Sequence, residues 1–212
     1  APQFNTAEQT IIITQGFIAS SSELFTTTLG REGSDFTAGI LAYCLNAESA
    51  TIWKDVPGML NADPKWFDNT IKLDNISYLE AVELAYYGAS VIHPKTIKPL
   101  QNKNIPLYVK SFVSPKESGT LINNETKKDA AIPSFIFKMN QVLISISAKD
   151  YSFVMEDSLS DVFGTFSKFG VKINLMQNSA ISFSACVDFD KQKTMKLIDE
   201  LKKSYKILYN DK

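Results

Sequence analysis

The chain has 212 residues, of which 44% are apolar and 21% are charged, and its formal net charge is −1. This length suits one large or two small domains, and the composition is ordinary for a globular protein. The near-neutral charge argues against a basic nucleic-acid surface. No apolar run is long enough for a membrane span or has the pattern of a signal peptide.

The few cysteine and histidine residues limit the chemistry further. Cys44 and Cys186 are no disulfide framework in a chain of this length, which predicts a reducing, cytoplasmic location. The single histidine, His93, has no cysteine or histidine at ligand spacing. We therefore expect no metal site and interpret His93 as a structural residue before a helix.

The first predicted elements are a strand and a helix. Residues 11–14 (Ile-Ile-Ile-Thr) form a β-branched run, which predicts a strand covered on both faces. Residues 35–47 carry apolar side chains at helical spacing, and Ser34 or Asp35 can cap the first turn of that helix.

The loop before this helix has the features of an anion site. Gly30 and Gly33 permit close approach of the backbone, and the helix N-terminus behind them favours negative charge. Arg31 is the only arginine in the sequence, and its planar fork can hold a carboxylate or a phosphate through two bonds. A structural ion pair between Arg31 and a nearby carboxylate is the alternative.

A second strand is predicted at 50–53, and it runs into two turns at 54–58 and 61–65. Strand, helix and strand in this order predict a βαβ unit with a parallel sheet. Ligands of such sheets bind beyond the carboxyl ends of the strands. The arginine loop and the loop of residues 54–65 can therefore face one site.

Local signals predict two more helices. Ser77 and Glu80 form a capping box at the start of a helix at 79–87, and Gly88 is a natural stop for it. Pro94 suits the first position of the next helix. Strands follow at 105–111 and 120–122, and the polar segment 123–133 is interpreted as a linker between two domains.

The remaining sequence has a different hydrophobic pattern. Apolar and polar residues alternate with period two in two predicted strands, and amphipathic helices are predicted around them. This order predicts a ferredoxin-like βαββαβ domain. Its predicted elements are 142–146, 159–169, 171–176, 181–188, 192–204 and 205–209.

Three motifs in chain order resemble those of the aspartokinases. Residues 26–35 are similar to the family's Thr-Thr-Leu-Gly-Arg-Gly-Gly-Ser-Asp signature, with Glu32 in place of a glycine. Residues 53–58 (Trp-Lys-Asp-Val-Pro-Gly) and the following Asp63 and Pro64 resemble its nucleotide loop. Residues 88–94 resemble its Gly-Ala-x-Val-Leu-His-Pro segment.

This resemblance implies an α/β protein with two domains. Residues 1–122 would form the C-terminal part of an amino-acid-kinase domain, that is, a partial three-layer α/β/α sandwich. Residues 123–133 would be the linker, and residues 134–212 a regulatory ACT domain with the ferredoxin-like βαββαβ fold.

The resemblance also implies three groups of binding residues. In the substrate group, Arg31 grips a carboxylate of aspartate and Asp35 receives its ammonium, with Ser34 beside them. The nucleotide group comprises Lys54, Asp55, Leu60, Lys65, Ser90 and Val91. The effector group comprises Met155, Ser158, Asn174, Gln177, Ser179 and Ile181.

Plainer interpretations of some of these residues remain open. Asp35 and Ser158 can be helix caps, Lys65 a solvated lysine, and Asn174 a solvent-facing strand residue. Many aspartokinases carry lysine where Ser90 stands and tyrosine where Leu60 stands. Without a lysine at the position of Ser90, the chain resembles the plant-type branch of the aspartokinases.

The implied reaction is phosphoryl transfer from ATP, with Mg²⁺, to the side-chain carboxylate of L-aspartate. This is the first step of lysine, threonine and methionine biosynthesis. The implied regulation is feedback by lysine or threonine on the ACT domain, in a homodimer formed through these domains. The family's Lys-Phe-Gly-Gly motif and its substrate-binding glutamate have no match here. ATP would therefore be bound largely by the missing half, and the isolated chain is predicted to be inactive.

Two other functions remain open at this point. The chain could be a non-catalytic regulatory subunit of an aspartokinase, which binds an amino acid and dimerises. It could also be another amino-acid kinase, such as one acting on glutamate. The substrate and nucleotide loops argue against the first alternative, and the ACT-like module argues against the second.

Overall fold

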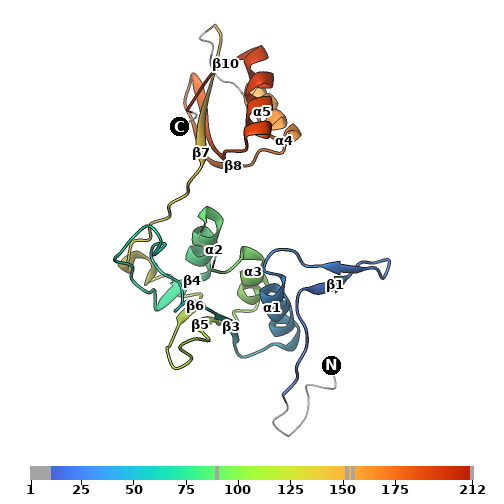
Figure 1. Ribbon diagram of the computed structural model, residues 1–212, viewed down its shortest axis with the longest axis vertical. Helices are drawn as coiled ribbons and strands as arrows, with labels where there is room; N and C mark the ends of the chain where they lie inside the picture. Colours follow the sequence, from blue (N-terminus) through green and yellow to red (C-terminus); the bar gives the residue numbers. More distant parts are fainter. Residues whose placement is uncertain (1–10, 89–90, 151–152, 154–155, 211–212) are drawn as a thin grey trace. The chain divides into compact units, whose positions relative to one another are not determined.

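The computed structural model describes residues 11–88, 91–150, 153 and 156–210. The chain divides into two compact units, Ala1–Phe137 and Lys138–Lys212 (Figure 1). The boundary thus follows Phe137, and segment 123–133, interpreted above as the linker, lies inside the first unit. The Asp129 carboxylate of this segment accepts a hydrogen bond from the Ser77 backbone N–H at 2.8 Å, which ties the segment to a buried strand end.

The first unit is built on a mixed four-stranded sheet with the strand order β3-β5-β6-β4. β3 runs parallel to β5, β5 antiparallel to β6, and β6 parallel to β4. Alternate residues of β5 are fully buried, as a strand with one face on a core requires. The bounds are β3 (Ala50–Lys54), β4 (Asn75–Ser77), β5 (Leu107–Ser111) and β6 (Thr120–Asn123).

Three helices pack with this sheet: α1 (Gly33–Leu45), α2 (Tyr78–Tyr87) and α3 (Pro94–Asn102). Half of the capping box predicted for α2 is confirmed, because Ser77 Oγ accepts from the Glu80 N–H at 3.0 Å, and Gly88 follows at φ 128° as predicted. The return bond from Glu80 is wrong, because the Ser77 N–H donates to the Asp129 carboxylate instead. The predicted structural role of His93 is also confirmed, because its Nδ1 accepts from the Lys95 N–H at the start of α3. α1 and α3 approach closely at Gly39, where an added Cβ would lie 2.9 Å from a carbonyl oxygen of α3.

A buried tyrosine joins α2 to the start of the next strand. Tyr78 is 2% exposed, and its hydroxyl donates to the Ile105 carbonyl oxygen at 2.5 Å. Burial raises the pKa of Tyr78 to about 12, because the phenolate would lose its hydration. The hydroxyl therefore remains protonated, and able to donate, well above neutral pH.

The strand predicted at 11–14 is wrong. Residues 11–16 form no regular element, and Ile11 and Ile13 are 90% and 92% exposed. β1 (Ile18–Ser20) instead pairs with β2 (Thr26–Thr28) in an antiparallel hairpin that projects from its unit in Figure 1. The predicted βαβ unit that began at 11–14 fails for the same reason. A β-branched run becomes a strand only where a neighbouring strand accepts its hydrogen bonds.

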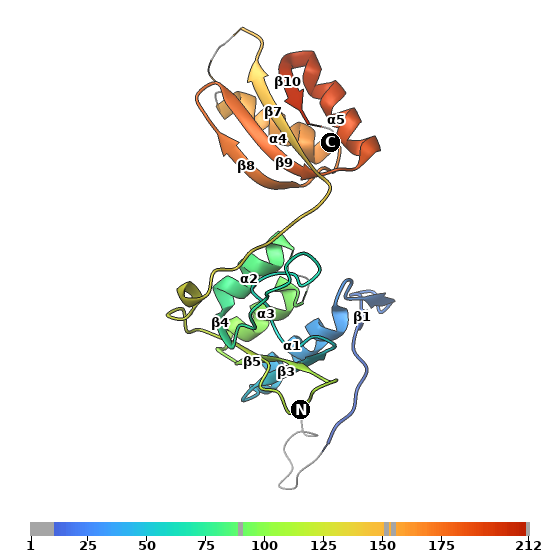
Figure 2. The same ribbon diagram turned by 60° about the vertical axis from the view of Figure 1, so that its left-hand side comes forward.

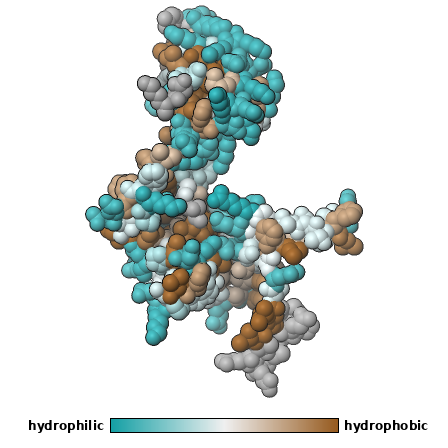
Figure 3. Space-filling view, viewed as in Figure 1, coloured by the Kyte–Doolittle hydropathy of each residue, from teal (hydrophilic) through white to brown (hydrophobic). Residues whose placement is uncertain are grey.

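The hairpin leaves much apolar surface in contact with solvent. Leu24 and Phe25 near its turn are 87% and 68% exposed. Figure 3 shows hydrophobic surface at the end of this hairpin and next to the N-terminal residues.

The second unit follows the predicted βαββαβ order. All its strand pairs are antiparallel, in the order β10-β7-β9-β8, and both helices lie on one side of the sheet (Figures 1 and 2). The elements are β7 (Gln141–Ala148), α4 (Glu156–Lys168), β8 (Ile173–Asn178), β9 (Ser182–Asp188), α5 (Lys191–Ser204) and β10 (Tyr205–Tyr209).

Period-two alternation places the core of this unit on the helix side of the sheet. Ile144 of β7, Val187 of β9 and Leu197 of α5 have no exposed surface, whereas Leu143 on the other face is 50% exposed. Among the described residues, no helix of either unit has the length and apolar character to cross a membrane.

Candidate functional site

The loop that carries Arg31 is shaped by left-handed backbone conformations. Gly30 has φ 80°, and Glu32 has φ 55° and precedes α1 without a side-chain cap. The cap predicted at Ser34 or Asp35 is therefore wrong, since α1 already begins at Gly33 and both side chains lie in its first turn. At Gly33 an added Cβ would lie 2.8 Å from the Phe17 ring, so glycine is needed for this close approach.

Arg31 lies on the surface of its unit. The residue is exposed, and among the described residues none forms an ion pair or hydrogen bond with its side chain. The alternative of a structural ion pair thus finds no support in the part of the chain that the structure describes. The guanidinium is available for a ligand anion.

Asp35 and Lys54 form an ion pair at 2.6 Å, between Asp35 Oδ2 and Lys54 Nζ. Their side chains are only 15% and 24% exposed. Asp35 belongs to the predicted substrate group and Lys54, the last residue of β3, to the predicted nucleotide group. The structure therefore brings one member of each group together at the carboxyl end of β3.

The loop after β3 is held by a buried threonine. Thr120 Oγ1 accepts from the Met59 N–H at 2.8 Å and donates to the Leu73 carbonyl oxygen at 2.6 Å. Gly58 has φ 144°, and a Cβ there would lie 2.5 Å from the same hydroxyl. Asn61 then closes the loop, because its side chain accepts from the Ile71 N–H and donates to the Pro133 carbonyl oxygen.

This loop forms most of the wall of a cavity of about 250 Å³. Leu60, Lys65 and Val91 of the predicted nucleotide group line it, whereas Lys54 and Asp55 do not. Ser90 lies outside the described residues. Lys65 is exposed, and no described residue pairs with its ammonium group, so an anionic part of a ligand in the cavity could meet it.

Sequence reasoning missed two features of this region. The segment Phe135, Ile136 and Phe137 lines the cavity, although it was assigned to the second domain. Its apolar side chains directly after the polar segment were the available signal. In addition, Glu32 Oε2 is buried without a hydrogen-bond partner, and the sequence showed only that Glu32 replaces a glycine.

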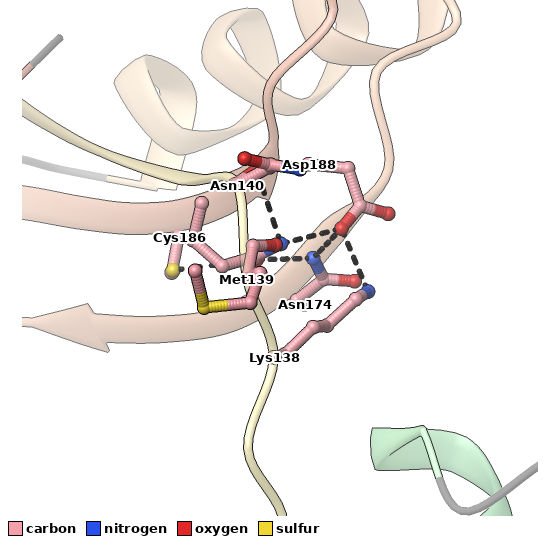
Figure 4. Close-up of polar contacts among 7 residues, drawn as sticks. Lys138, Met139, Asn140, Asn174, Cys186 and Asp188 are labelled. Atoms are coloured by element: carbon pink, nitrogen blue, oxygen red, sulfur yellow. Dashed lines mark hydrogen bonds and ion pairs between the residues drawn. The ribbon is translucent and has the colours of Figure 1, made fainter. Parts of the chain in front are cut away.

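In the second unit, Asn174 is part of a polar cluster at one end of the sheet (Figure 4). The β8–β9 register shifts between Ile173 and Leu175, which leaves Asn174 as an extra residue whose side chain is redirected. Its amide donates to Gln141 Oε1 at 2.7 Å and to Asp188 Oδ1 at 3.0 Å.

The carboxylate of Asp188 is the centre of this cluster. Its Oδ1 also accepts from Gln141 Nε2 at 2.6 Å and forms an ion pair with Lys138 at 2.7 Å. Desolvation alone would raise the pKa of Asp188, but hydrogen bonds from three neighbours outweigh it and lower the pKa below its usual value. We name Lys138, Gln141, Asn174 and Asp188 the Asp188 cluster.

Of the other predicted effector residues, those that the structure describes form no hydrogen bond with this cluster. Gln177 is near the end of β8, Ser179 hydrogen-bonds Ser182 in the β8–β9 turn, and Ile181 is 51% exposed. Four residues of β8 lie between Asn174 and Ser179, and the five steps of extended chain span about 16 Å. Ser158 lies in the first turn of α4 rather than at its cap, and Met155 falls outside the described residues.

Comparisons with known proteins identify the family of the chain. Residues 3–111 match the amino acid kinase family. The chain belongs to the amino acid kinase family. It is 37% identical to the lysine-sensitive aspartokinase 3 of Escherichia coli over 84% of this chain and 39% of that protein.

Solved structures of aspartokinases are also similar to this chain. The chain resembles E. coli aspartokinase III in complex with lysine and aspartate, with a TM-score of 0.77, 34% identity, and coverage of 92% of this chain and 45% of that one. The same enzyme with aspartate and ADP gives a TM-score of 0.72 at 33% identity, with the same coverage. The chain thus spans less than half the length of these relatives.

Proposed function

We propose that the chain is part of an aspartokinase that transfers the γ-phosphoryl group of ATP to the side-chain carboxylate of L-aspartate. The ion pair between Asp35 and Lys54 is the observation that carries this proposal. This ion pair connects the loop that carries the unpaired Arg31 to β3. The loop that follows β3 lines the cavity. A carboxylate substrate and a nucleotide could therefore meet at one edge of the sheet.

The residues of the cavity fit a nucleotide better than a small polar ligand. Leu60 and Val91 offer an apolar wall for a base, and Lys65 offers a cation for a phosphate. When bound, MgATP supplies the phosphoryl group. Among the described residues no three His, Cys, Asp or Glu side chains are grouped so that they could hold a metal ion, and we assign Mg²⁺ no ligand in this chain.

The residues of this chain would act by positioning and by balancing charge. Arg31 would orient aspartate through two bonds to a carboxylate, and Asp35 would attract its ammonium. Lys54 holds the Asp35 carboxylate in place and keeps the site near neutrality. An ionised carboxylate needs no general base to attack a phosphoryl group, so His93 stays at its helix cap.

The nucleotide part is tested by titrating the 212-residue chain with MgADP in a calorimeter. We expect saturable binding that weakens in Lys65→Met and is unchanged in Lys98→Met, an exposed lysine of α3 outside the cavity. A coupled kinase assay should show no turnover by this chain alone, since the Lys-Phe-Gly-Gly motif is missing from it. Binding of lysine or threonine without any binding of MgADP would favour the regulatory-subunit alternative.

The substrate part is tested by Arg31→Lys in an active enzyme that contains this segment. Lysine keeps the charge and loses the planar fork, so kcat/KM for aspartate should fall. The expected loss of transition-state stabilisation is about 1.5–3 kcal/mol. The KM for ATP is the internal control. Unchanged kinetics would contradict a substrate role for Arg31.

For the second unit we propose an ACT regulatory domain that binds lysine or threonine and forms a homodimer. A lysine complex of an aspartokinase from E. coli supports an amino-acid effector. β8 is an edge strand with Leu175 and Met176 about 60% exposed, which suits pairing with a second copy. In thermal melts, an effector at a hundredfold its Kd should stabilise the chain by about 2.7 kcal/mol. No shift with either amino acid would contradict the site.

A further inference from the structure

We propose that Lys54 binds the phosphoryl group that is transferred, while its ion pair with Asp35 holds it between the substrate loop and the nucleotide cavity. This role rests on the proposed kinase function and adds to it a residue that contacts the reacting group. Three observations support it: the place of Lys54 in the sheet, the unused hydrogen-bond donors of its ammonium group, and its partial burial.

The backbone of Lys54 is fixed at the carboxyl end of β3. Lys54 pairs with Ser111 of the parallel strand β5, and its carbonyl oxygen accepts from the Phe112 N–H at 2.9 Å. Ligands of parallel sheets bind beyond this end of the strands. The base of the Lys54 side chain is therefore anchored at the edge of the sheet where a ligand is expected.

Lys54 also lies between the two parts of the candidate site. Its ammonium group contacts Asp35, which follows Arg31 by four residues in the predicted substrate group. Val56, two residues after Lys54, lines the cavity. Two steps of chain span at most about 7 Å, so the Lys54 backbone is near the cavity without lining it. A phosphoryl group that left a nucleotide in the cavity for a carboxylate held by Arg31 would pass through this region.

The ammonium group of Lys54 has unused hydrogen-bond donors. It carries three N–H groups, and Asp35 Oδ2 accepts from it at 2.6 Å. Within the described part of the chain, no other atom accepts a hydrogen bond from this ammonium, and the side chain is only 24% exposed. A partly buried ammonium is costly unless its remaining donors find acceptors in water or a ligand. A phosphoryl group offers negatively charged oxygens to both of them.

The ion pair prepares this ammonium for a ligand, because Asp35 keeps it in one place before the ligand binds. Attraction between Lys54 and a phosphate is also stronger at a partly buried position than in bulk water. Lys65, which lines the cavity, remains the partner of an inner phosphate.

The charge of Lys54 suits the reaction itself. In the transfer, a carboxylate oxygen of aspartate forms a bond to the γ-phosphorus. The bond from this phosphorus to the β–γ bridging oxygen breaks, and ADP leaves. No proton moves in this step. Lys54 would offset the negative charge that is spread over the oxygens of the transferred group.

The first experiment compares two nucleotides that differ in the terminal phosphate, by calorimetric titration of the 212-residue chain. The probes are MgADP and the magnesium complex of the non-hydrolysable β,γ-imido analogue of ATP. The unmodified chain should bind the analogue more tightly than MgADP. In Lys54→Met we expect the Kd of the analogue to rise at least about fivefold and that of MgADP to change less than about twofold. Lys98→Met, in an exposed lysine of α3 outside the cavity, should leave both Kd values unchanged.

This comparison separates a contact with the phosphoryl group from a purely structural role. A Lys54 that only ties α1 to β3 would, when replaced, weaken both nucleotides alike, and that result would overturn the proposal. Equal binding of the analogue by Lys54→Met and the unmodified chain would also overturn it and would leave the nucleotide site intact. The same holds if the unmodified chain binds both nucleotides equally. A chain that binds neither nucleotide would contradict the proposed nucleotide site, and the role of Lys54 with it.

A second variant guards against a loss of fold, because Lys54→Met leaves the Asp35 carboxylate unpaired. In Lys54→Met/Asp35→Asn this charge is gone, and the same selective weakening of analogue binding is expected. Far-ultraviolet circular dichroism verifies that both variants fold. A double variant that folds and binds the analogue as tightly as the unmodified chain would contradict the proposal.

The second experiment measures turnover in an active enzyme that contains this segment. Lys54→Met should lower kcat at least about tenfold, since a cation on the transferred group is lost. Lys54→Arg, which keeps a cation at this position, should recover part of the loss. An unchanged kcat in Lys54→Met would show that Lys54 does not contact the transferred group.

Discussion

The two units differ in how far their candidate binding groups are already paired within the chain. In the first unit, no described residue pairs with the side chains of Arg31 and Lys65, although Asp35 and Lys54 of the same unit form a close ion pair. In the second unit, Asn174 has two partners and Asp188 Oδ1 has three. A ligand can bind the unpaired cations without breaking an internal contact, whereas a ligand of the Asp188 cluster must replace one. The first arrangement agrees with the proposed substrate site, whereas the polar groups of the second are already hydrogen-bonded without a ligand.

The largest expected effect tests whether the two units are separate structures. Ile144→Ala in the second core and Leu107→Ala in the first each remove a fully buried side chain. Each should cost about 2–5 kcal/mol of unfolding free energy, through lost burial and a residual cavity. Hydrogen exchange by mass spectrometry should show faster exchange within the altered unit. The same set of amides responding to both substitutions would contradict the division into two units.

A smaller effect is expected from breaking the one close ion pair of the candidate substrate site. Lys54→Met leaves the mostly buried Asp35 carboxylate without its partner, which should cost about 1–2 kcal/mol after allowance for its partial exposure. Adding Asp35→Asn should recover most of this loss, because the unpaired charge is then gone. Chemical denaturation of the two single variants and the double variant measures the interaction. Additive losses would mean that the pair contributes nothing.

Glu32→Gly should stabilise the first unit. Glu32 adopts φ 55°, a conformation that costs an L-residue about 1 kcal/mol and costs glycine nothing. The change also removes a buried carboxylate oxygen without a partner. A rise of the melting temperature is expected, and Glu48→Gly, at an exposed position with no left-handed backbone, is the control. A fall would show that the Glu32 carboxylate stabilises the loop.

The smallest effect concerns pH and the Asp188 cluster. The pKa of Asp188 is lowered in the folded state, so its contribution to stability is present above the ordinary value of 3.8 and is lost as pH falls through the folded value. Asp188 is largely exposed, and we therefore expect only a slight extra loss of stability in acid. Melting curves of the unmodified chain and Asp188→Asn should converge as the pH is lowered well below 3.8. A difference that persists unchanged at that pH would contradict the assignment.

Prediction from sequence succeeded where the signal was local. The Ser77 cap of α2, the start of α3 at Pro94 and the strand β10 are all as expected, because each depends on neighbours a few residues away. Prediction failed at 11–14, since composition shows that a segment can be a strand and does not show whether another strand accepts its hydrogen bonds. It failed also at the cap of α1, where a left-handed Glu32 starts the helix without a side-chain bond.

For the candidate site, the sequence by itself determined which residue types are present: one arginine in a glycine loop, a turn-rich loop after β3, and a βαββαβ unit after them. Only the tertiary structure decided which of them meet. The Asp35–Lys54 ion pair, the bond from Phe135 to Asn61 and the three donors on Asp188 Oδ1 all join residues far apart in the chain. Such contacts depend on the packing of whole elements, and no periodicity within one element encodes them.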